Sequence, residues 1–285
     1  MKRGWILLLP VLVFLFVARN PLFGATDLVV LEKEVVRQGE IFQVSVISSR
    51  VIERCSVRYR DNEVLLKTEG RRAKGFFGFD LAEKPGEKVL KVVISRGGTE
   101  VTEEKRVRVV DARFPVQRID GVPDSYVNPD KKSLRRIMEE KKLLDSLWTS
   151  SSQDIFWSGN FIPPLEGFQG HGFGRRRVIN GQPRSPHTGL DCTAPEGTPV
   201  RAVNRGVVRV ARDLFFSGNS VVIDHGGGLF SMYFHLKEMF VKEGEVVEKG
   251  ELIGTVGMTG RATGPHLHFG VRFVNERVDP TGLFR

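Results

Sequence analysis

Short segments of alternating apolar and polar residues, separated by glycine turns, recur along most of this chain of 285 residues. In "IFQVSVIS", for example, Phe42, Val44 and Val46 share one face and the polar residues share the other. A period of two is typical of a strand with one buried face. With 31 glycines available for turns, the chain is predicted to be mainly β.

The character of the sequence changes twice, which predicts two β domains joined by a helical segment. Regularly spaced strand candidates over residues 26–112 indicate an immunoglobulin-like β-sandwich. Residues 113–158 are predicted to be a linker that contains a helix. Residues 159–285 return to short strands and glycine turns, which predicts an antiparallel β-sheet domain without a long helix.

The helix of the linker is predicted from "DKKSLRRIMEEKKLLDSLW", in which Asp130 is placed as the N-cap. Most of its apolar residues fall on roughly one helical stripe, which Lys141 interrupts: Leu134, Ile137, Met138, Leu144, Leu147 and Trp148. A stripe of this kind needs a surface to pack against. We therefore expect a packed connecting helix rather than a flexible tether.

The N-terminal residues predict export. Two basic residues precede the apolar run Trp5–Val17, which is too short to cross a bilayer comfortably. This run and the small residue at Ala25 indicate a secretory signal over residues 1–25. Phe23 fits poorly so close to the cleavage point, so an uncleaved membrane anchor is the alternative. No cysteine follows the run, which argues against a lipid anchor.

Charge and cysteine content narrow the class of partner. The net charge of +9 favours anionic partners, but an exported protein, periplasmic or secreted, is not expected to bind nucleic acid. Basic and aromatic residues alternate over 71–81 as in some RNA-binding strands, but their spacing and the surrounding strand order favour a sandwich strand. Cys55 and Cys192 lie in different predicted domains, so we expect two buried thiols rather than a disulfide.

The histidine pair in "TGPHLHFGV" indicates chemistry rather than packing. Residues two apart on a strand point to the same side, so the imidazoles of His266 and His268 converge. Leu267 and Phe269 then turn into the core. The chain has six histidines in all, so the pairing is not expected by chance.

Three further polar groups upstream complete a set for metal-assisted hydrolysis. His187 and Asp191 in "HTGLD" also have matching parity, and His235 lies in the apolar strand "MYFHL". Three nitrogen and oxygen ligands with an open fourth position describe a catalytic zinc site, and the two remaining histidines can transfer protons and stabilise an oxyanion. The HExxH and GxSxG motifs of other hydrolases are absent from the sequence.

This order of motifs resembles the lysostaphin-type zinc endopeptidases, which cut peptidoglycan cross-links. The similarity runs from about Phe161 to Phe284 and includes "HTGLD", "VVIDHGGGLFSMYFHL" and "TGPHLHFGV". It implies a small antiparallel β-sheet domain with a groove over the metal. It also implies the roles of five residues: zinc ligands His187, Asp191 and His268, and catalytic histidines His235 and His266.

Other residues near the expected groove have less defined roles. Arg175 and Arg176 either meet substrate carboxylates at the groove rim or are ordinary surface charges. His171 either lines the groove or is a solvated loop histidine, and His225 is expected to serve a hairpin turn. Gly270 stands where family members often carry an acidic residue, so we expect an effect on packing or substrate fit only.

The sequence therefore predicts a zinc metalloendopeptidase, with one Zn²⁺ per chain, that hydrolyses peptide cross-links of bacterial peptidoglycan through a metal-activated water. The alternative is a non-catalytic regulator of the same fold that activates a cell-wall amidase. Relatives of that kind lack metal ligands, and this chain has all of them. Cross-links ending in D-Ala and diaminopimelate and glycine bridges both remain open as substrates, and the oligomeric state is not predicted.

Two hypotheses describe the linker. Residues 113–158 either partly cover the groove in the resting protein, or the helix packs behind the sheet and sets the spacing of the domains.

Overall fold

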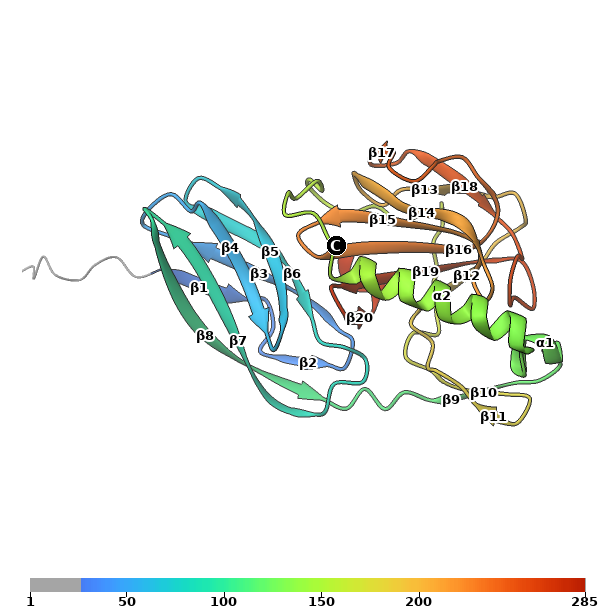
Figure 1. Ribbon diagram of the computed structural model, residues 1–285. Coiled ribbons are helices and arrows are strands. Elements are labelled where there is room, and N and C mark those ends of the chain that lie inside the picture. The colour runs from blue at the N-terminus through green and yellow to red at the C-terminus, as the bar shows by residue number, and fades with distance from the viewer. Residues whose placement is uncertain (1–26, 285) are drawn as a thin grey trace, which may run out of the picture.

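The computed structural model describes residues 27–284, and its strands form two large sheets, one on the left and one on the right of Figure 1, with the connecting segment running from the first to the second. The first is eight-stranded and the second nine-stranded, so the chain is mainly β, as predicted. The predicted signal or anchor over residues 1–25 lies outside the described residues. Within residues 27–284, no helix combines the length and apolar character needed to cross a membrane.

The N-terminal unit folds its eight-stranded sheet into two layers. β5 pairs with β4 through residues 62–66 and with β6 through residues 67–69, so it carries the sheet from one layer to the other. Aromatic rings from both layers meet, because Tyr59 lies 6.4 Å from Phe77 between ring centroids. The immunoglobulin-like topology stays a prediction. The strands are β1 (Leu28–Leu31), β2 (Val35–Arg37), β3 (Ile41–Ile47), β4 (Arg54–Tyr59), β5 (Asn62–Glu69), β6 (Arg72–Gly78), β7 (Gly86–Arg96) and β8 (Thr99–Val110), in the order β1-β3-β6-β5-β4-β7-β8-β2.

The C-terminal unit is built on one antiparallel sheet in the order β12-β19-β16-β15-β14-β17, with β13, β18 and β20 paired off this path. Within it, β19 lies between β12 and β16. This agrees with the predicted second β domain. The elements are β12 (Gly189–Thr193), β13 (Pro199–Arg201), β14 (Gly206–Leu214), β15 (Gly218–Gly226), β16 (Leu229–Met239), β17 (Val246–Val247), β18 (Leu252–Val256), β19 (His266–Phe273), β20 (Glu276–Val278) and the 3-10 helix η1 (Pro280–Leu283).

The predicted alternation holds in β3, whereas the central strands β15 and β16 of the C-terminal unit are buried on both faces. Phe42, Val44 and Val46 of β3 are all buried in the core. Cys55 of β4 and Cys192 of β12 are free and buried, as expected. Burial raises the pKa of the Cys55 thiol to about 12, so this residue is an unreactive core side chain.

The connecting segment adds a strand to the C-terminal unit. β9 (Val116–Ile119) pairs in parallel with β10 (Arg176–Ile179), and β10 pairs antiparallel with β11 (Gln182–Pro183). Two residues distant in sequence, Gln117 and Arg177, are thereby cross-strand partners. The segment is therefore part of the C-terminal structure rather than a tether.

Two helices follow, α1 (Asp124–Val127) and α2 (Lys131–Trp148). The Asp130 carboxylate accepts a hydrogen bond from the Ser133 N–H at 2.7 Å, which confirms the predicted N-cap. The predicted stripe is only partly correct, because Leu134 and Met138 are exposed. The last turn of α2 buries Leu147 and Trp148 against the sheet, and Arg136 nearer its start donates to Asp213 of β14.

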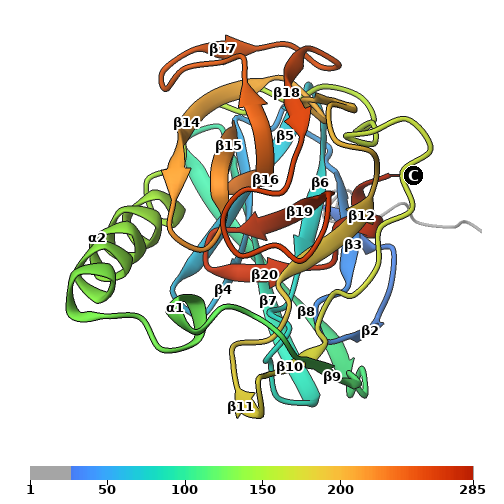
Figure 2. The ribbon, with the colours of Figure 1, turned by 90° about the vertical axis from the view of Figure 1, so that its right-hand side faces the viewer.

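Helix α2 packs on one face of the C-terminal sheet (Figure 2), and this face includes Phe234, whose ring stacks on His268 at 5.5 Å between ring centroids. The Trp148 ring packs 5.3 Å from Phe230, and the Arg272 guanidinium lies 4.6 Å from the Trp148 ring centroid. Phe230 and Arg272 are cross-strand partners, and Arg272 is four residues beyond His268 on β19. The hypothesis that the helix packs behind the sheet is therefore wrong.

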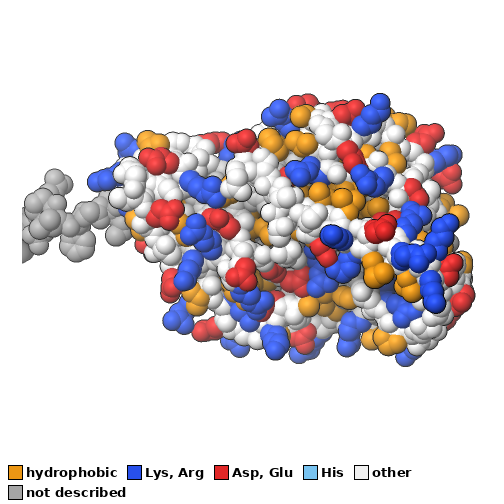
Figure 3. All heavy atoms as spheres, in the orientation of Figure 1, with side chains coloured by type: hydrophobic (Ala, Val, Ile, Leu, Met, Phe, Trp, Pro, Cys, Tyr) orange, Lys and Arg blue, Asp and Glu red, His pale blue; other side chains and the backbone are white. Residues whose placement is uncertain are grey.

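The N-terminal and C-terminal units contact one another through hydrogen bonds and through apolar side chains. Asp80 accepts hydrogen bonds from Arg277 Nε at 2.8 Å and Nη2 at 2.6 Å. Glu276 accepts from Asn62 Nδ2 at 2.6 Å and from the Asp80 N–H at 2.7 Å. Buried apolar residues of both units also belong to one continuous cluster. Over the face shown in Figure 3, basic and acidic side chains are interspersed, so the net charge of +9 is not concentrated there.

We predict that Trp148→Ala lowers the free energy of unfolding by about 3–5 kcal/mol, because it removes a large buried side chain and leaves a cavity. Met138→Ala, on the exposed side of the same helix, is the matched control and should change it by about 0.5 kcal/mol or less. Urea denaturation followed by circular dichroism would measure both. Identical midpoints for the two variants would contradict the packing of α2 on the sheet.

Candidate metal centre and active site

The predicted alternation around the histidine pair is confirmed. Leu267 and Phe269 are fully buried in the core, whereas His266 and His268 line a cavity on the other face of β19. The antiparallel register of β12 and β19 makes Asp191 the cross-strand partner of His268. Two residues distant in sequence therefore point into the same space.

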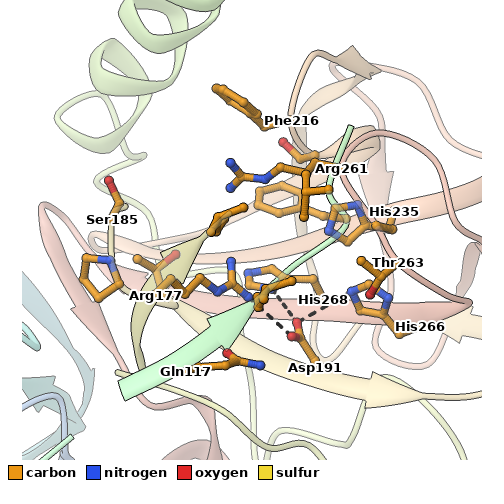
Figure 4. A pocket seen from close by; sticks show the side chains of 18 residues that line it. Gln117, Arg177, Ser185, Asp191, Phe216, His235, Arg261, Thr263, His266 and His268 are labelled. Atoms are coloured by element: carbon orange, nitrogen blue, oxygen red, sulfur yellow. Dashed lines mark hydrogen bonds and ion pairs between the residues drawn. The ribbon is translucent and has the colours of Figure 1, made fainter. Parts of the chain in front are cut away.

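Three side-chain atoms converge at this pair, and Figure 4 shows two of the residues that supply them, Asp191 and His268, pointing toward one another. His187 Nε2 lies 2.9 Å from Asp191 Oδ1 and 2.9 Å from His268 Nδ1. His268 Nδ1 also lies 2.9 Å from Asp191 Oδ1. Two ring nitrogens and one carboxylate oxygen around a single point are a donor set that fits a divalent metal ion. These three residues form a candidate metal site.

Two glycines make room for the ligand histidines. A Cβ at Gly189 would lie 2.7 Å from His268 Nε2 and 2.5 Å from the Phe269 carbonyl oxygen. Gly172 has a φ of 96°, and a Cβ there would lie 2.8 Å from His187 Nδ1. Any larger residue at either position would displace a ligand, so both glycines are required by close approach.

Burial and hydrogen bonding set the charge states of the ligands. Burial lowers the pKa of His268 to about 4, although Asp191 acts to raise it. Burial also acts to raise the pKa of Asp191, but hydrogen bonds from His187 and His268 outweigh it and hold that pKa well below its usual range. Neutral imidazole and ionised carboxylate are the states that bind a metal ion.

The two remaining histidines lie next to this cluster. The ring centroids of His235 and His266 are 4.8 Å apart, and His266 Nε2 lies 3.7 Å from Asp191 Oδ1. His235 Nδ1 donates to the Thr259 carbonyl oxygen at 2.8 Å, and His266 Nδ1 donates to the Gly264 carbonyl oxygen at 2.8 Å. Because a carbonyl oxygen only accepts, each Nδ1 carries a proton and each Nε2 is left to face the site.

His235 is held in a strained backbone conformation. Its φ is 63°, in the left-handed region that costs a non-glycine residue on the order of 1 kcal/mol or more. Its N–H donates to the Ser217 carbonyl oxygen at 2.8 Å, which ties the strand to the neighbouring turn. Burial lowers the pKa of His235 to about 3. Strain of this kind is typical of residues placed for function.

The three residues predicted to contact substrate do not line this cavity. His171 is exposed, and its backbone pairs with that of Asp191 through hydrogen bonds of 3.1 and 2.8 Å. Arg176 is exposed, and its Nε donates to the Phe114 carbonyl oxygen at 3.2 Å. Arg175 is half-buried and lies outside the cavity. The structure therefore gives His171 a positioning role through its backbone and leaves both arginines outside the cavity.

His225 is a buried residue next to the turn of the β15–β16 hairpin. It is fully buried on β15, and its Nδ1 lies 2.8 Å from the Arg205 carbonyl oxygen. Its Nε2 lies 2.8 Å from Ser231 Oγ on the neighbouring strand. The hydrogen bond to Ser231 spans the β15–β16 hairpin, which agrees with the predicted role of His225 at this turn.

Sequence reasoning missed several residues that complete the cavity. It has a volume of about 400 Å³ and is lined by Gln117 and Ile119 of β9, Arg177 of β10, and Arg261 of the loop before β19. The sequence did contain one signal for an arginine in the cavity. Neighbouring residues on a strand face opposite sides, so the consecutive arginines of "GFGRRR" cannot all point to solvent. The pattern did not indicate which one.

The connecting segment therefore forms part of the cavity wall. The Gln117 Oε1 atom is buried there and has no hydrogen-bond partner among residues 27–284. A second cavity of about 980 Å³ continues from Phe216 and Phe234 along α2 to Trp148. The hypothesis that residues 113–158 partly cover the site is supported by this wall, and control of activity by it stays a prediction.

Comparison with known proteins identifies the C-terminal unit. Residues 185–280 match peptidase family M23, and the matched range contains the five residues of the cluster. The C-terminal unit is an M23 domain. The resemblance to the lysostaphin-type peptidases is thereby confirmed.

Two curated relatives share the M23 domain. Peptidoglycan DD-endopeptidase ShyA of Vibrio cholerae is 47% identical over 85 residues, which is 30% of this chain and 20% of that protein. The DD-carboxypeptidase/endopeptidase Mpg of Neisseria meningitidis is 45% identical over 97 residues, which is 34% of this chain and 22% of that protein. This chain thus spans about a fifth of the length of the curated relatives it matches.

A solved structure resembles nearly the whole chain. The crystal structure of a candidate M23 peptidase from Pseudomonas aeruginosa is 29% identical, with a TM-score of 0.62. The alignment covers 89% of this chain and 96% of that one. The likeness therefore extends beyond the M23 domain to the N-terminal unit and the connecting segment.

Within the M23 domain, Gly270 has a packing role. It is buried on the same face as His268, and a Cβ there would lie 2.6 Å from Met232 Cε. An acidic residue would have to displace this methionine from the face on which α2 packs. The packing effect expected from glycine at position 270 is therefore the room that it leaves for the Met232 side chain.

We expect His268→Ala and Asp191→Ala to lose most of their bound metal, because a site with three protein ligands has no spare donor. Elemental analysis of the purified proteins would measure the metal content. His171→Ala is the control, since this exposed side chain lies outside the cavity, and it should retain the metal content of the wild type. Full occupancy in both ligand variants would refute the assignment.

Proposed function

We propose that this chain is a zinc metalloendopeptidase that hydrolyses peptide cross-links of bacterial peptidoglycan. The observation that carries the proposal is the convergence of His187, Asp191 and His268 beside two histidines whose Nε2 atoms face the site. The M23 assignment supports it. Its relatives, a peptidoglycan DD-endopeptidase and a DD-carboxypeptidase/endopeptidase, also support it.

The donor set favours Zn²⁺ as the metal. Two imidazole nitrogens and one carboxylate oxygen suit zinc, whereas Mg²⁺ and Ca²⁺ prefer oxygen ligands. When bound at this point, zinc would supply a water of lowered pKa and polarise the peptide carbonyl. His187, Asp191 and His268 would hold it.

His235 and His266 are proposed to move protons during hydrolysis. Their Nδ1 atoms are fixed by backbone carbonyls, so each Nε2 carries a lone pair directed at the site. A neutral imidazole in this position accepts a proton and returns it to the departing amine. In its protonated form it also stabilises negative charge on the carbonyl oxygen under attack.

The substrate class implies a location outside the cytoplasm. We propose that the protein is periplasmic or secreted, where peptidoglycan peptides are accessible. Membrane association through an uncleaved N-terminal segment is the alternative to a cleaved signal.

The non-catalytic regulator remains the second candidate and is disfavoured by the site itself. All three candidate ligands are present and their donor atoms converge. Both proton-transferring histidines are also in place. A regulator that only binds an amidase has no need of this set of groups.

Mass spectrometry of fragments released from purified peptidoglycan tests the proposed activity. The full chain should release cross-link cleavage products, and a chelator should abolish them until zinc is restored. New amino and carboxyl termini would identify the bond that is cut. Intact cross-links after incubation with the zinc-loaded protein would contradict the proposal and favour the regulator.

His235→Ala is predicted to retain its zinc but to reduce hydrolysis by about a hundredfold or more, because it loses a proton-transferring group and no ligand. His266→Ala should behave similarly. Metal content and kcat/KM would be measured together, with His171→Ala as the unaffected control. Turnover close to that of the wild type would remove His235 from the mechanism.

A further inference from the structure

Two arginines face the cavity over the candidate metal site, and only one of them has a carboxylate partner among the described residues. Arg177 lies on β10, and Arg261 lies in the loop between β18 and β19. Figure 4 shows both side chains among those that line the cavity, together with His235, His266 and His268. Asp191 is the only acidic residue among those lining it.

Arg261 has no carboxylate partner among residues 27–284. Its guanidinium lies 4.6 Å from the Phe216 ring centroid, which is a favourable contact with a ring but supplies no counter-charge. The charges on Arg177 and Arg184 repel it. The pKa of Arg261 is lowered to about 10, mainly by burial and to a smaller extent by this repulsion.

Arg177 is only weakly neutralised. Its Nη2 lies 3.5 Å from Asp191 Oδ2, at the limit of a hydrogen bond. Its Nε is buried and has no hydrogen-bond partner among the described residues. Asp191 already accepts from His187 and His268, so its negative charge is shared among several groups. The cavity therefore carries an excess of positive charge before any metal binds.

A guanidinium removed from water needs an anion in hydrogen-bond contact. A carboxylate is a planar partner that two parallel N–H groups can bind. We propose that Arg261, assisted by Arg177, binds a free carboxylate of the substrate peptide next to the bond that is cleaved. This inference rests on the proposed function, because it takes the occupant of the cavity to be a peptide.

The proposal narrows the substrate class. Cross-links with a free carboxylate beside the scissile amide would be preferred over cross-links that continue as uncharged amides, such as a glycine bridge. Both arginines line the same cavity as His235 and His266, so a carboxylate held there is close to the reacting atoms. Arg261 thereby acts as a specificity-determining residue.

The test compares two probes, N-acetyl-Lys-D-Ala-D-Ala as the free acid and as its C-terminal amide. Dissociation constants are measured on the chelator-treated full chain, and kcat/KM on the zinc-loaded chain. Arg118→Gln is the matched control for Arg261→Gln, because Arg118 is an exposed arginine of β9 and the change in charge is the same. Arg261→Lys keeps the charge and loses the paired N–H groups.

The free acid should bind the wild type and Arg118→Gln about tenfold or more tightly than the amide. In Arg261→Gln this ratio should fall to about one, and Arg261→Lys should restore part of it. Equal binding of acid and amide by the wild type, or a ratio that Arg261→Gln leaves unchanged, would overturn the proposal. Failure of the zinc-loaded chain to hydrolyse either probe or peptidoglycan would count against the proposed enzyme alone, because the binding ratio does not require turnover.

Discussion

The register of β19 between β12 and β16 is the constraint on which the site depends. It pairs His268 with Asp191 on one side and with Phe234 on the other. Leu267 and Phe269 are fully buried, and a slip of one residue would expose them and turn the histidines into the core. The burial of these two side chains therefore fixes the direction of His266 and His268.

The proton-transferring histidines depend on the backbone in a different way. His235 and His266 each donate from Nδ1 to a main-chain carbonyl oxygen, at 2.8 Å in both cases. This arrangement selects one tautomer and orients each Nε2 before substrate arrives. His235 also keeps a left-handed conformation, with its N–H held by the Ser217 carbonyl. The packing of the surrounding sheet offsets that local strain, as expected for groups that must be positioned in advance.

The cavity is a composite of segments distant in sequence. β9 of the connecting segment pairs with β10 and brings Gln117 to the wall, while α2 borders the adjoining cavity through Trp148. The Asp80–Arg277 pair and the shared apolar core hold the N-terminal unit against the same domain. The M23 domain by itself lacks part of this wall. The likeness of the Pseudomonas aeruginosa structure over nearly the whole chain indicates that the arrangement is not peculiar to this sequence.

The sequence by itself, chiefly through its alternation of apolar and polar residues, determined the features that depend on residues close together in the chain. It predicted a mainly β fold, the outward direction of His266 and His268, and the Asp130 cap of α2, because parity and capping depend on residues a few positions apart. The tertiary structure alone decided which arginines enter the cavity and which face α2 covers. Arg177 is turned inward by the pairing of β9 with β10, and Arg261 by a loop that lies over the site. Contacts of this kind join residues far apart in sequence, and their energy depends on the shape of the packed sheet, which no short pattern encodes.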